Sequence, residues 1–149
     1  MPELDCTVVE DVMTYRPTVV APDDPLAHAA RLFEEKGFDL LPVCLEGRLV
    51  GVLSHQDLLR ACAPAVRPAG AVPVVLNDVL ARPVAGCMSR QPATVEAQAP
   101  LAQVLEKFIA HGVYALPVVF GALLVGIVSR RDVVRALRMA AGTGVQVAV

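Results

Sequence analysis

The residues of this chain that can do chemistry are a serine and an aspartate three positions apart, and the arrangement occurs twice. Ser54 and Asp57 form the first pair, and Ser129 and Asp132 form the second. At the start of a helix, such a pair can act as a cap in which each side chain accepts from a backbone N–H of the other residue. The same N–H groups and hydroxyl can instead hold a phosphate, and the carboxylate can hold a ribose diol through charge-assisted hydrogen bonds.

The surroundings of the two pairs bear on this choice. Arg130 and Arg131 follow the second serine and can neutralise phosphate charge, whereas His55 follows the first serine and can do so only in part. A glycine stands three positions before each serine, at Gly51 and Gly126. Capping alone requires no such glycine, which favours a ligand site, although relief of crowding at a strand bulge is the alternative.

Both pairs belong to an internal repeat in which residue 13 aligns with residue 88, an offset of 75 positions. Positions 12–60 and 87–135 share 17 identities over 49 residues without a gap, far above chance, so the chain is an internal duplication. We assign repeat 1 to residues 8–62 and repeat 2 to residues 83–138. A Pro/Gly-rich linker, residues 63–82, joins them, and residues 139–149 form a tail that frays or pairs as an edge strand.

Each repeat reads as strand, helix, strand, strand, helix. Alternating and β-branched runs predict the strands, and apolar residues at i, i+3, i+4 and i+7 predict the helices. Pro25 and Pro100 suit the first helical position, and Gly37 and Gly112 suit left-handed caps at the helix ends. The predicted strands are 18–20, 40–45, 49–54, 93–95, 115–120 and 123–128, the second helix of each repeat runs over 54–63 or 129–139, and the linker adds a helical turn at 77–80.

Composition limits the function classes. Of the residues, 55% are hydrophobic, which in a chain of 149 residues predicts that part of the apolar surface is buried in a subunit interface. The net charge is −2 and no basic cluster exists, which argues against nucleic acid or a membrane as a partner. The uncharged stretch 112–129 is interrupted by Pro117, Gly121 and Gly126, so it is interpreted as a hairpin rather than a membrane span.

The chain carries no enzyme motif. The four cysteines show no CxxC spacing and the three histidines are scattered, which excludes the usual zinc and haem sites and favours a reduced, cytoplasmic setting. The N-terminus does not have the pattern of a signal peptide. Catalytic triad spacing, a P-loop and a metal-binding carboxylate cluster are all missing, so we expect no catalysis and no cofactor.

The duplicated pattern resembles a tandem pair of cystathionine-β-synthase-type (CBS) domains, also called a Bateman module. The resemblance rests on Met13 and Met88, on Leu-Pro-Val before each turn, and on glycine, two apolar residues and Ser-x-x-Asp at each last strand–helix junction. It implies an α/β fold of tandem CBS repeats packed about a pseudo-twofold axis. It also implies two clefts for an adenosyl ligand such as AMP, ADP, ATP or S-adenosylmethionine.

Carried over by position, the resemblance implies two sets of ligand-binding residues, each drawn from both repeats. One cleft uses Thr18, Phe38, Asp39 and Leu41 with Ser129, Arg130, Arg131 and Asp132. The other uses Ala93, Val113, Tyr114 and Leu116 with Ser54, His55 and Asp57. Asp39 is a departure, because many members of the family have a small or neutral residue there; it can accept from an adenine amino group or repel a polyphosphate. Because only one cleft has arginines, we expect Asp132 to matter more than Asp57 for nucleotide affinity.

The function that follows is a free-standing regulatory module that binds an adenosyl ligand and signals to an unidentified partner protein. The alternative is a ligand-free dimerisation scaffold in which Ser-x-x-Asp only caps helices. In either case the apolar composition, together with the flat disc-shaped dimers of the family, predicts a homodimer.

Overall fold

The structure is a computed structural model that describes residues 4–67, 70 and 72–142. Its internal contacts divide the chain into two units that do not coincide with the two sequence repeats. Unit 1 comprises Met1–Pro17 and Ala93–Val149, and unit 2 comprises Thr18–Pro92. Unit 2 is therefore continuous in sequence and is inserted into unit 1.

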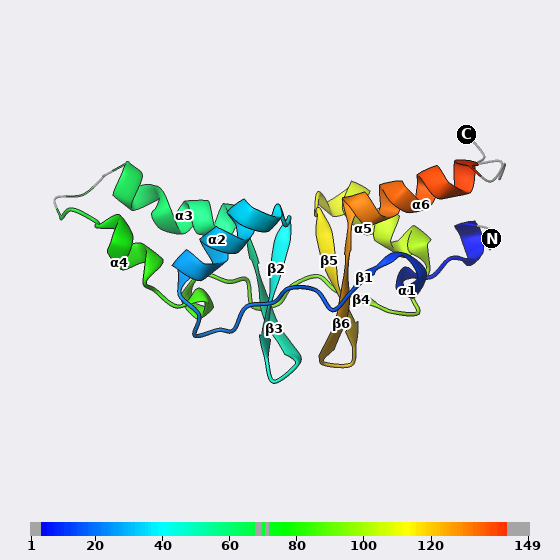
Figure 1. The fold of residues 1–149 in the computed structure, drawn as a ribbon, viewed down its shortest axis with the longest axis horizontal. Coiled ribbons are helices and arrows are strands. Elements are labelled where there is room, and N and C mark those ends of the chain that lie inside the picture. The colour runs from blue at the N-terminus through cyan, green and yellow to red at the C-terminus, as the bar shows by residue number, and fades with distance from the viewer. Residues whose placement is uncertain (1–3, 68–69, 71, 143–149) are drawn as a thin grey trace. The chain divides into compact units, whose positions relative to one another are not determined.

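Unit 2 is built on the antiparallel hairpin of β2 (Leu40–Leu45) and β3 (Arg48–Ser54). Its turn, Glu46 and Gly47, has positive φ at both residues, which is the backbone that a two-residue hairpin with the normal strand twist requires. Helices pack beside the hairpin (Figure 1). They are α2 (Leu26–Lys36), α3 (His55–Val66), α4 (Leu76–Leu80) and the short 3-10 helix η2 (Val84–Gly86).

Unit 1 repeats this plan with the antiparallel hairpin of β5 (Ala115–Phe120) and β6 (Leu123–Ser129). Two-residue strands add to it: β4 (Val95–Glu96) runs parallel to β5, and β1 (Thr14–Tyr15) runs antiparallel to β6. The helices are η1 (Leu4–Cys6), α1 (Val9–Val12), α5 (Leu101–His111) and α6 (Arg130–Gly142).

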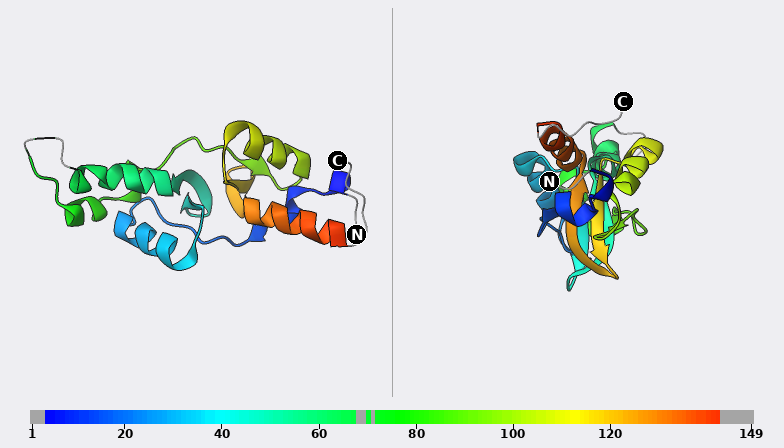
Figure 2. Two further views of the ribbon diagram at one scale, coloured as in Figure 1. Left: turned by 90° about the horizontal axis from the view of Figure 1, so that it is seen from above. Right: turned by 90° about the vertical axis from the view of Figure 1, so that its right-hand side faces the viewer.

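The segment at the start of each repeat, residues 7–15 or 82–90, packs on the hairpin of the other repeat, and we call these two stretches the exchanged segments. Thr14 pairs with Ile127 of β6, and Ser89 pairs in the same way with Val52 of β3. Further along the two segments, the N–H of Leu101 donates to the carbonyl of Thr7 at 2.9 Å. At the equivalent place in unit 2, the N–H of Leu26 donates to the carbonyl of Arg82 at 2.9 Å. Figure 2 shows the blue N-terminal segment lying against the orange β6 and α6 of unit 1.

Each unit has its own hydrophobic core, made mainly of valine and leucine side chains from the hairpin and its helices. In unit 1 the core includes Val9 and Met13 from the N-terminal segment, together with Val95, Leu101, Val104, Leu116, Val118, Val128 and Val133. In unit 2 the core includes Val79 of the linker and Val84 at the start of repeat 2, together with Val20, Leu26, Ala29, Phe33, Leu41, Val43 and Leu53. Each core therefore contains side chains from one of the exchanged segments.

Most predicted elements are confirmed. Both hairpins lie within one residue of the predicted strands. Gly37 and Gly112 adopt the left-handed conformation, at φ values of 65° and 62°, and end α2 and α5. Helix α4 contains the turn that was predicted at 77–80.

Six of the predicted elements require correction at their boundaries. Pro25 and Pro100 are N-caps with extended backbone, one residue before the helix rather than within it. The strand predicted at 18–20 is reduced to a single bridge between Val20 and Val43, and the one predicted at 93–95 becomes β4. Helix α3 continues through Pro64, where the missing N–H removes only one bond of the last turn. Helix α6 continues to Gly142, and the rest of the predicted tail lies outside the described residues.

Candidate functional site: two strand–helix junctions

In unit 2 the candidate site is the junction between β3 and α3, where Ser54 is the N-cap. The N–H of Asp57 donates to the Ser54 hydroxyl at 3.1 Å, and the N–H of Ser54 donates to the Asp57 carboxylate at 2.9 Å. The capping interpretation of this pair is therefore confirmed. The second oxygen of Asp57 lies 3.6 Å from the guanidinium of Arg60, which makes an ion pair with it.

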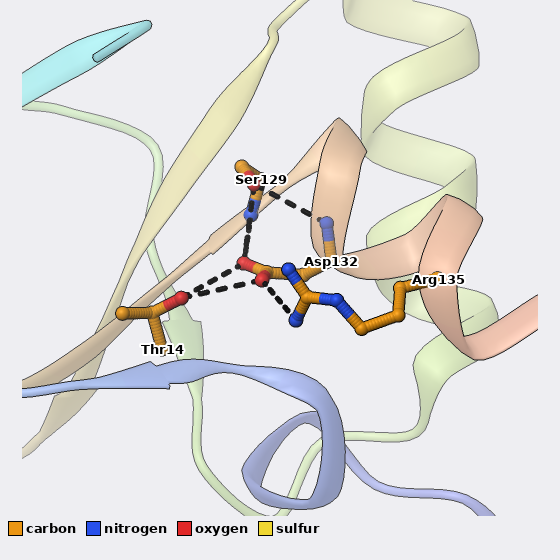
Figure 3. A network of polar contacts seen from close by, with 4 residues as sticks. All are labelled: Thr14, Ser129, Asp132 and Arg135. Atoms are coloured by element: carbon orange, nitrogen blue, oxygen red, sulfur yellow. Dashed lines mark hydrogen bonds and ion pairs between the residues drawn. The ribbon is translucent and has the colours of Figure 1, made fainter. Parts of the chain in front are cut away.

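In unit 1 the junction between β6 and α6 has the same cap and two further partners (Figure 3). The N–H of Asp132 donates to the Ser129 hydroxyl at 3.3 Å, and the N–H of Ser129 donates to the carboxylate at 2.9 Å. The Thr14 hydroxyl also donates to the carboxylate, at 3.2 Å from Oδ1 and 3.5 Å from Oδ2. Arg135 contacts Oδ1 at 3.3 Å. The Asp132 side chain is only 3% exposed because of these contacts.

The glycine before each cap has a structural reason that the sequence interpretation missed. A Cβ on Gly126 would lie 2.6 Å from the sulfur of Met13 and 2.9 Å from the carbonyl oxygen of Thr14. A Cβ on Gly51 would lie 2.7 Å from the carbonyl oxygen of Ser89 and 2.8 Å from the sulfur of Met88. The use of these glycines as an argument for a ligand site was wrong, since they make room for the exchanged segment.

The residues just before β2 and β5 lie at the same hairpin end as the caps. Leu40 pairs with Ser54 in unit 2, and Ala115 pairs with Ser129 in unit 1, so Phe38 and Asp39 or Val113 and Tyr114 approach the helix start. In unit 1 this contact is direct. The Arg130 guanidinium lies 4.0 Å from the centre of the Tyr114 ring, and the N–H of Arg130 donates to the carbonyl of Tyr114 at 3.1 Å.

The first helical residue of α3 makes a different contact. The His55 ring lies 4.3 Å from the Phe33 ring, centre to centre, and Phe33 belongs to the unit 2 core. An aromatic side chain on α2 therefore holds His55, whereas an exposed Tyr114 beside the hairpin holds Arg130. The first residue of the helix therefore packs against a core aromatic ring in unit 2 and against an exposed one in unit 1.

The remaining predicted site residues fall into two groups. The side chains of Leu41 and Leu116 belong to the two cores, with exposures of 0% and 1%. Thr18, Ala93 and Arg131 are exposed. Within a unit the structure brings the cap residues together with the residues before the neighbouring strand. The assignment of all these residues to clefts shared by the two repeats stays a prediction.

Sequence reasoning missed three residues that shape the junctions. Arg135 had a signal, because it aligns with Arg60 in the duplication. The signal at Thr14 was weaker: a residue with a hydroxyl group follows the methionine in each repeat. This pattern gave no indication that the partner of Thr14 lies 118 positions away. Phe33 recurs as Phe108 but was interpreted only as part of a helix face.

Other chemistry is sparse around the junctions. No group of three or more His, Cys, Asp or Glu side chains that could hold a metal occurs in the part of the chain that the structure describes. Burial raises the pKa of the Cys87 thiol; Asp57 and Cys62 raise it further, and Arg82 lowers it in part. Across residues 4–67, 70 and 72–142, no helix is both long and apolar enough to span a membrane.

Comparison with known proteins gives these junctions a family context. The family model of the CBS domain matches residues 9–64 and again residues 82–139. Hypoxic response protein 1 of Mycobacterium tuberculosis is 29% identical over 134 residues, which cover 88% of this chain and 85% of that protein. The uncharacterized protein MJ1225 of Methanocaldococcus jannaschii is 29% identical over 133 residues, 86% of this chain, and the match spans only 46% of that protein.

Solved structures agree with this context. The crystal structure of CBSX2 in complex with AMP has a TM-score of 0.75 and 29% identity, and the match covers 90% of this chain and 98% of CBSX2. The structure of MJ1225 has a TM-score of 0.78 and 27% identity, over 89% of this chain and 48% of MJ1225. Two in-register family matches cover more than half of the chain, and the structure shows two equivalent α/β units. The chain therefore belongs to the CBS domain family, as a tandem pair of CBS domains.

Proposed function

We propose that this protein is a regulatory module that binds an adenosyl ligand at its strand–helix junctions and passes the occupancy of the site to a partner protein. The observation that carries the proposal is the duplicated Ser-x-x-Asp helix start in a chain that is 29% identical to CBSX2, whose crystal structure contains AMP. The absence of an enzyme motif in the sequence is consistent with regulation rather than catalysis.

The chemistry of the junctions suits such a ligand. The first turn of a helix offers backbone N–H groups and positive potential to a phosphate, and a nearby carboxylate can accept from both hydroxyls of a ribose. The exposed Arg130 and Arg131 at the start of α6 add two positive charges. Val113 and Tyr114 before β5, and Phe38 before β2, supply apolar and aromatic surface for a base.

A nucleotide panel tests this proposal. Thermal unfolding would be followed with AMP, ADP, ATP and S-adenosylmethionine, with GMP and GTP as matched controls that carry the same phosphates on another base. A ligand at about 100 times its Kd adds about 2.7 kcal/mol to the free energy of unfolding. For a chain of this size we expect Tm to rise by several degrees. No rise with any adenosyl compound would contradict the proposal.

A ligand-free dimerisation scaffold is the second candidate, and the completed caps at both junctions favour it. Ser54 and Ser129 both accept from the helix N-terminus, and both aspartates accept from the serine N–H, so the motif has a structural role without any ligand. The scaffold predicts that Asp57→Ala and Asp132→Ala change stability alone. The regulatory module predicts that at least one of them also removes the Tm shift caused by AMP.

Both candidates include a homodimer, and we propose that α3 and α6 contribute its interface. These helices carry exposed apolar side chains at helical spacing, namely Leu59 and Val66 on α3 and Val134 and Leu137 on α6. Leu59 and Val134 occupy equivalent positions of the repeat. Light scattering should give a mass of about twice 15.7 kDa.

Charge placed on both helices should break the dimer. We expect Leu59→Glu with Val134→Glu to give a monomer with an unchanged circular dichroism spectrum. Phe120→Glu is the matched control, because Phe120 is 72% exposed but lies at the turn of the β5–β6 hairpin. A monomeric wild-type protein at micromolar concentration would contradict the proposed assembly. The cytoplasmic location that the cysteine pattern favours also stays part of the proposal.

A further inference from the structure

The carboxylate of Asp132 has no capacity left for a ribose. It accepts from the N–H and the hydroxyl of Ser129 at 2.9 and 3.1 Å, from the Thr14 hydroxyl, and from Arg135 at 3.3 Å. A carboxylate offers about four lone-pair positions, and these donors use them. Because the side chain is also 3% exposed, a ligand can reach it only by displacing one of these partners.

Among these partners, Thr14 is the one that comes from a distant part of the chain, 118 positions before Asp132. Its hydroxyl lies 3.2 Å from one carboxylate oxygen and 3.5 Å from the other, so it faces both oxygens at once (Figure 3). A ribose diol would direct one O–H donor at each oxygen, whereas the single hydroxyl of Thr14 lies across both and donates to one of them at a time. Thr14 belongs to the N-terminal segment, so this contact also ties that segment to the start of α6.

The equivalent junction of unit 2 is less fully occupied. Ser89 holds the position of Thr14, and its backbone pairs with Val52 as that of Thr14 pairs with Ile127. Among the described residues, no hydrogen bond joins the Ser89 hydroxyl to Asp57, and the Arg60 guanidinium stands off at 3.6 Å. The Asp57 side chain, at 10% exposed, retains acceptor positions that Asp132 has lost.

We propose that Thr14 determines which junction binds the adenosyl ligand: Asp57 holds the ribose in unit 2, whereas Thr14 closes Asp132 and turns the unit 1 junction into a fixed attachment of the N-terminal segment. This inference rests on the proposed function and adds its site preference. The arginine charges suggested that Asp132 matters more than Asp57 for nucleotide affinity, and the inference reverses this ranking. A ligand that cannot reach the Asp132 carboxylate gains no affinity from Arg130 and Arg131.

Calorimetric titration of the 149-residue chain with AMP tests the inference. We expect one AMP per chain in the wild-type protein, and a roughly ten- to hundredfold weaker affinity in Asp57→Ala, the effect of losing a charge-assisted hydrogen bond. Asp132→Ala should leave AMP affinity within about twofold. Thr14→Val replaces the hydroxyl donor by a methyl group that cannot satisfy the buried carboxylate. The N-terminal segment should therefore separate from Asp132 and open a second site, which Asp132→Ala removes again.

Two controls separate this effect from a general disturbance of β1. Thr14→Ser keeps the hydroxyl and should retain the wild-type stoichiometry, and Ser89→Ala removes the equivalent hydroxyl of unit 2 and should also leave it unchanged. In the absence of AMP, amide hydrogen exchange of residues 9–16 should accelerate in Thr14→Val but not in Ser89→Ala.

The outcomes that overturn the inference differ from those that overturn the proposed function. If AMP binds the wild-type protein and is lost in Asp132→Ala but not in Asp57→Ala, the site preference is wrong while the function stands. If Thr14→Val leaves both the stoichiometry and the exchange of residues 9–16 unchanged, Thr14 has no such role. Failure of AMP and the rest of the adenosyl panel to bind any variant would overturn the function and the preference together.

Discussion

The two strand–helix junctions share a motif but differ in how their aspartates are surrounded. Asp57 in unit 2 accepts from its cap serine and faces Arg60 across 3.6 Å. Asp132 in unit 1 accepts from its cap serine and from Arg135, and also from Thr14 of a segment 118 positions away. The residue that distinguishes the two junctions is Thr14, which is equivalent to Ser89 in the repeat and lies outside the Ser-x-x-Asp motif.

This difference shows that a motif match and a ligand contact are separate properties of a site. The motif guarantees the cap, because cap geometry needs only residues three positions apart. Whether the carboxylate can also accept from a ligand depends on the segment packed over it, which the motif does not contain. The units can therefore share a fold and a cap while only one of them offers its carboxylate.

The largest expected effect concerns the exchanged N-terminal segment. Deletion of residues 1–16 removes Val9 and Met13 from the core of unit 1, together with the carbonyl that accepts from the N–H of Leu101. Full burial of each such apolar side chain stabilises by about 1.5–3 kcal/mol, so we expect a loss of about 3–6 kcal/mol. The loss should be confined to unit 1. Amide hydrogen exchange, resolved by peptide, measures this directly.

Unit 2 provides the control for this deletion. Its chain is continuous from Thr18 to Pro92 and contains its own exchanged segment, so its peptides should keep their protection in the truncated protein. A uniform loss of protection across both units would contradict the division of the chain into two units. Normal protection in unit 1 would contradict the packing of the N-terminal segment.

The features that could be predicted from the sequence are those that depend on residues close together in the chain. The hairpins, Gly37 and Gly112, and the two caps depend on residues close in sequence, and they are confirmed to within a residue or so. The exchange of segments could not be predicted, because each repeat contains both the methionine and the glycine that it contacts. Either partner would satisfy the same local pattern. The two-residue strand β1 has no periodicity that could reveal it.

A smaller effect is expected when the glycines under the exchanged segments are filled. A Cβ at Gly126 would meet the carbonyl oxygen of Thr14 at 2.9 Å, and one at Gly51 would meet that of Ser89 at 2.7 Å. Backbone atoms cannot rotate away, so we expect Gly126→Ala and Gly51→Ala each to lower the free energy of unfolding by about 1–3 kcal/mol. Gly86→Ala is the matched control, since a Cβ there would meet nothing within 4 Å. A loss at only one of the two glycines would show that the segments are not equivalent.

Lengthening each aspartate side chain by one methylene should lower the free energy of unfolding by different amounts at the two junctions, and this difference should be smaller than the effects above. Asp132→Glu misplaces a buried carboxylate with partners at both oxygens, and we expect a loss of about 1–3 kcal/mol. Asp57→Glu should cost less than about 1 kcal/mol, because Glu suits the third position of a capping box and this side chain has more room. Urea unfolding of the two variants measures the difference. Equal losses would mean that the Thr14 contact adds nothing to the rigidity of unit 1.

The smallest expected effect is a difference in thiol reactivity between the cysteines of the two units. Burial raises the pKa of Cys44, and burial with the nearby Asp57 and Cys62 raises that of Cys87, both in unit 2. Because the thiolate is the nucleophile, a raised pKa leaves less of it at neutral pH, and burial also restricts access. Cys6 of unit 1 is exposed, so iodoacetamide at pH 7.5 should label it first and Cys44 and Cys87 last. The same shifts predict that the free energy of unfolding of unit 2 declines as the pH rises past the ordinary thiol pKa, because the unfolded chain ionises there before the folded one does. Mass spectrometry of the labelled peptides, repeated in urea, gives the comparison. Equal labelling rates for Cys6 and Cys87 in the folded protein would contradict the lower access and the raised pKa of the Cys87 thiol.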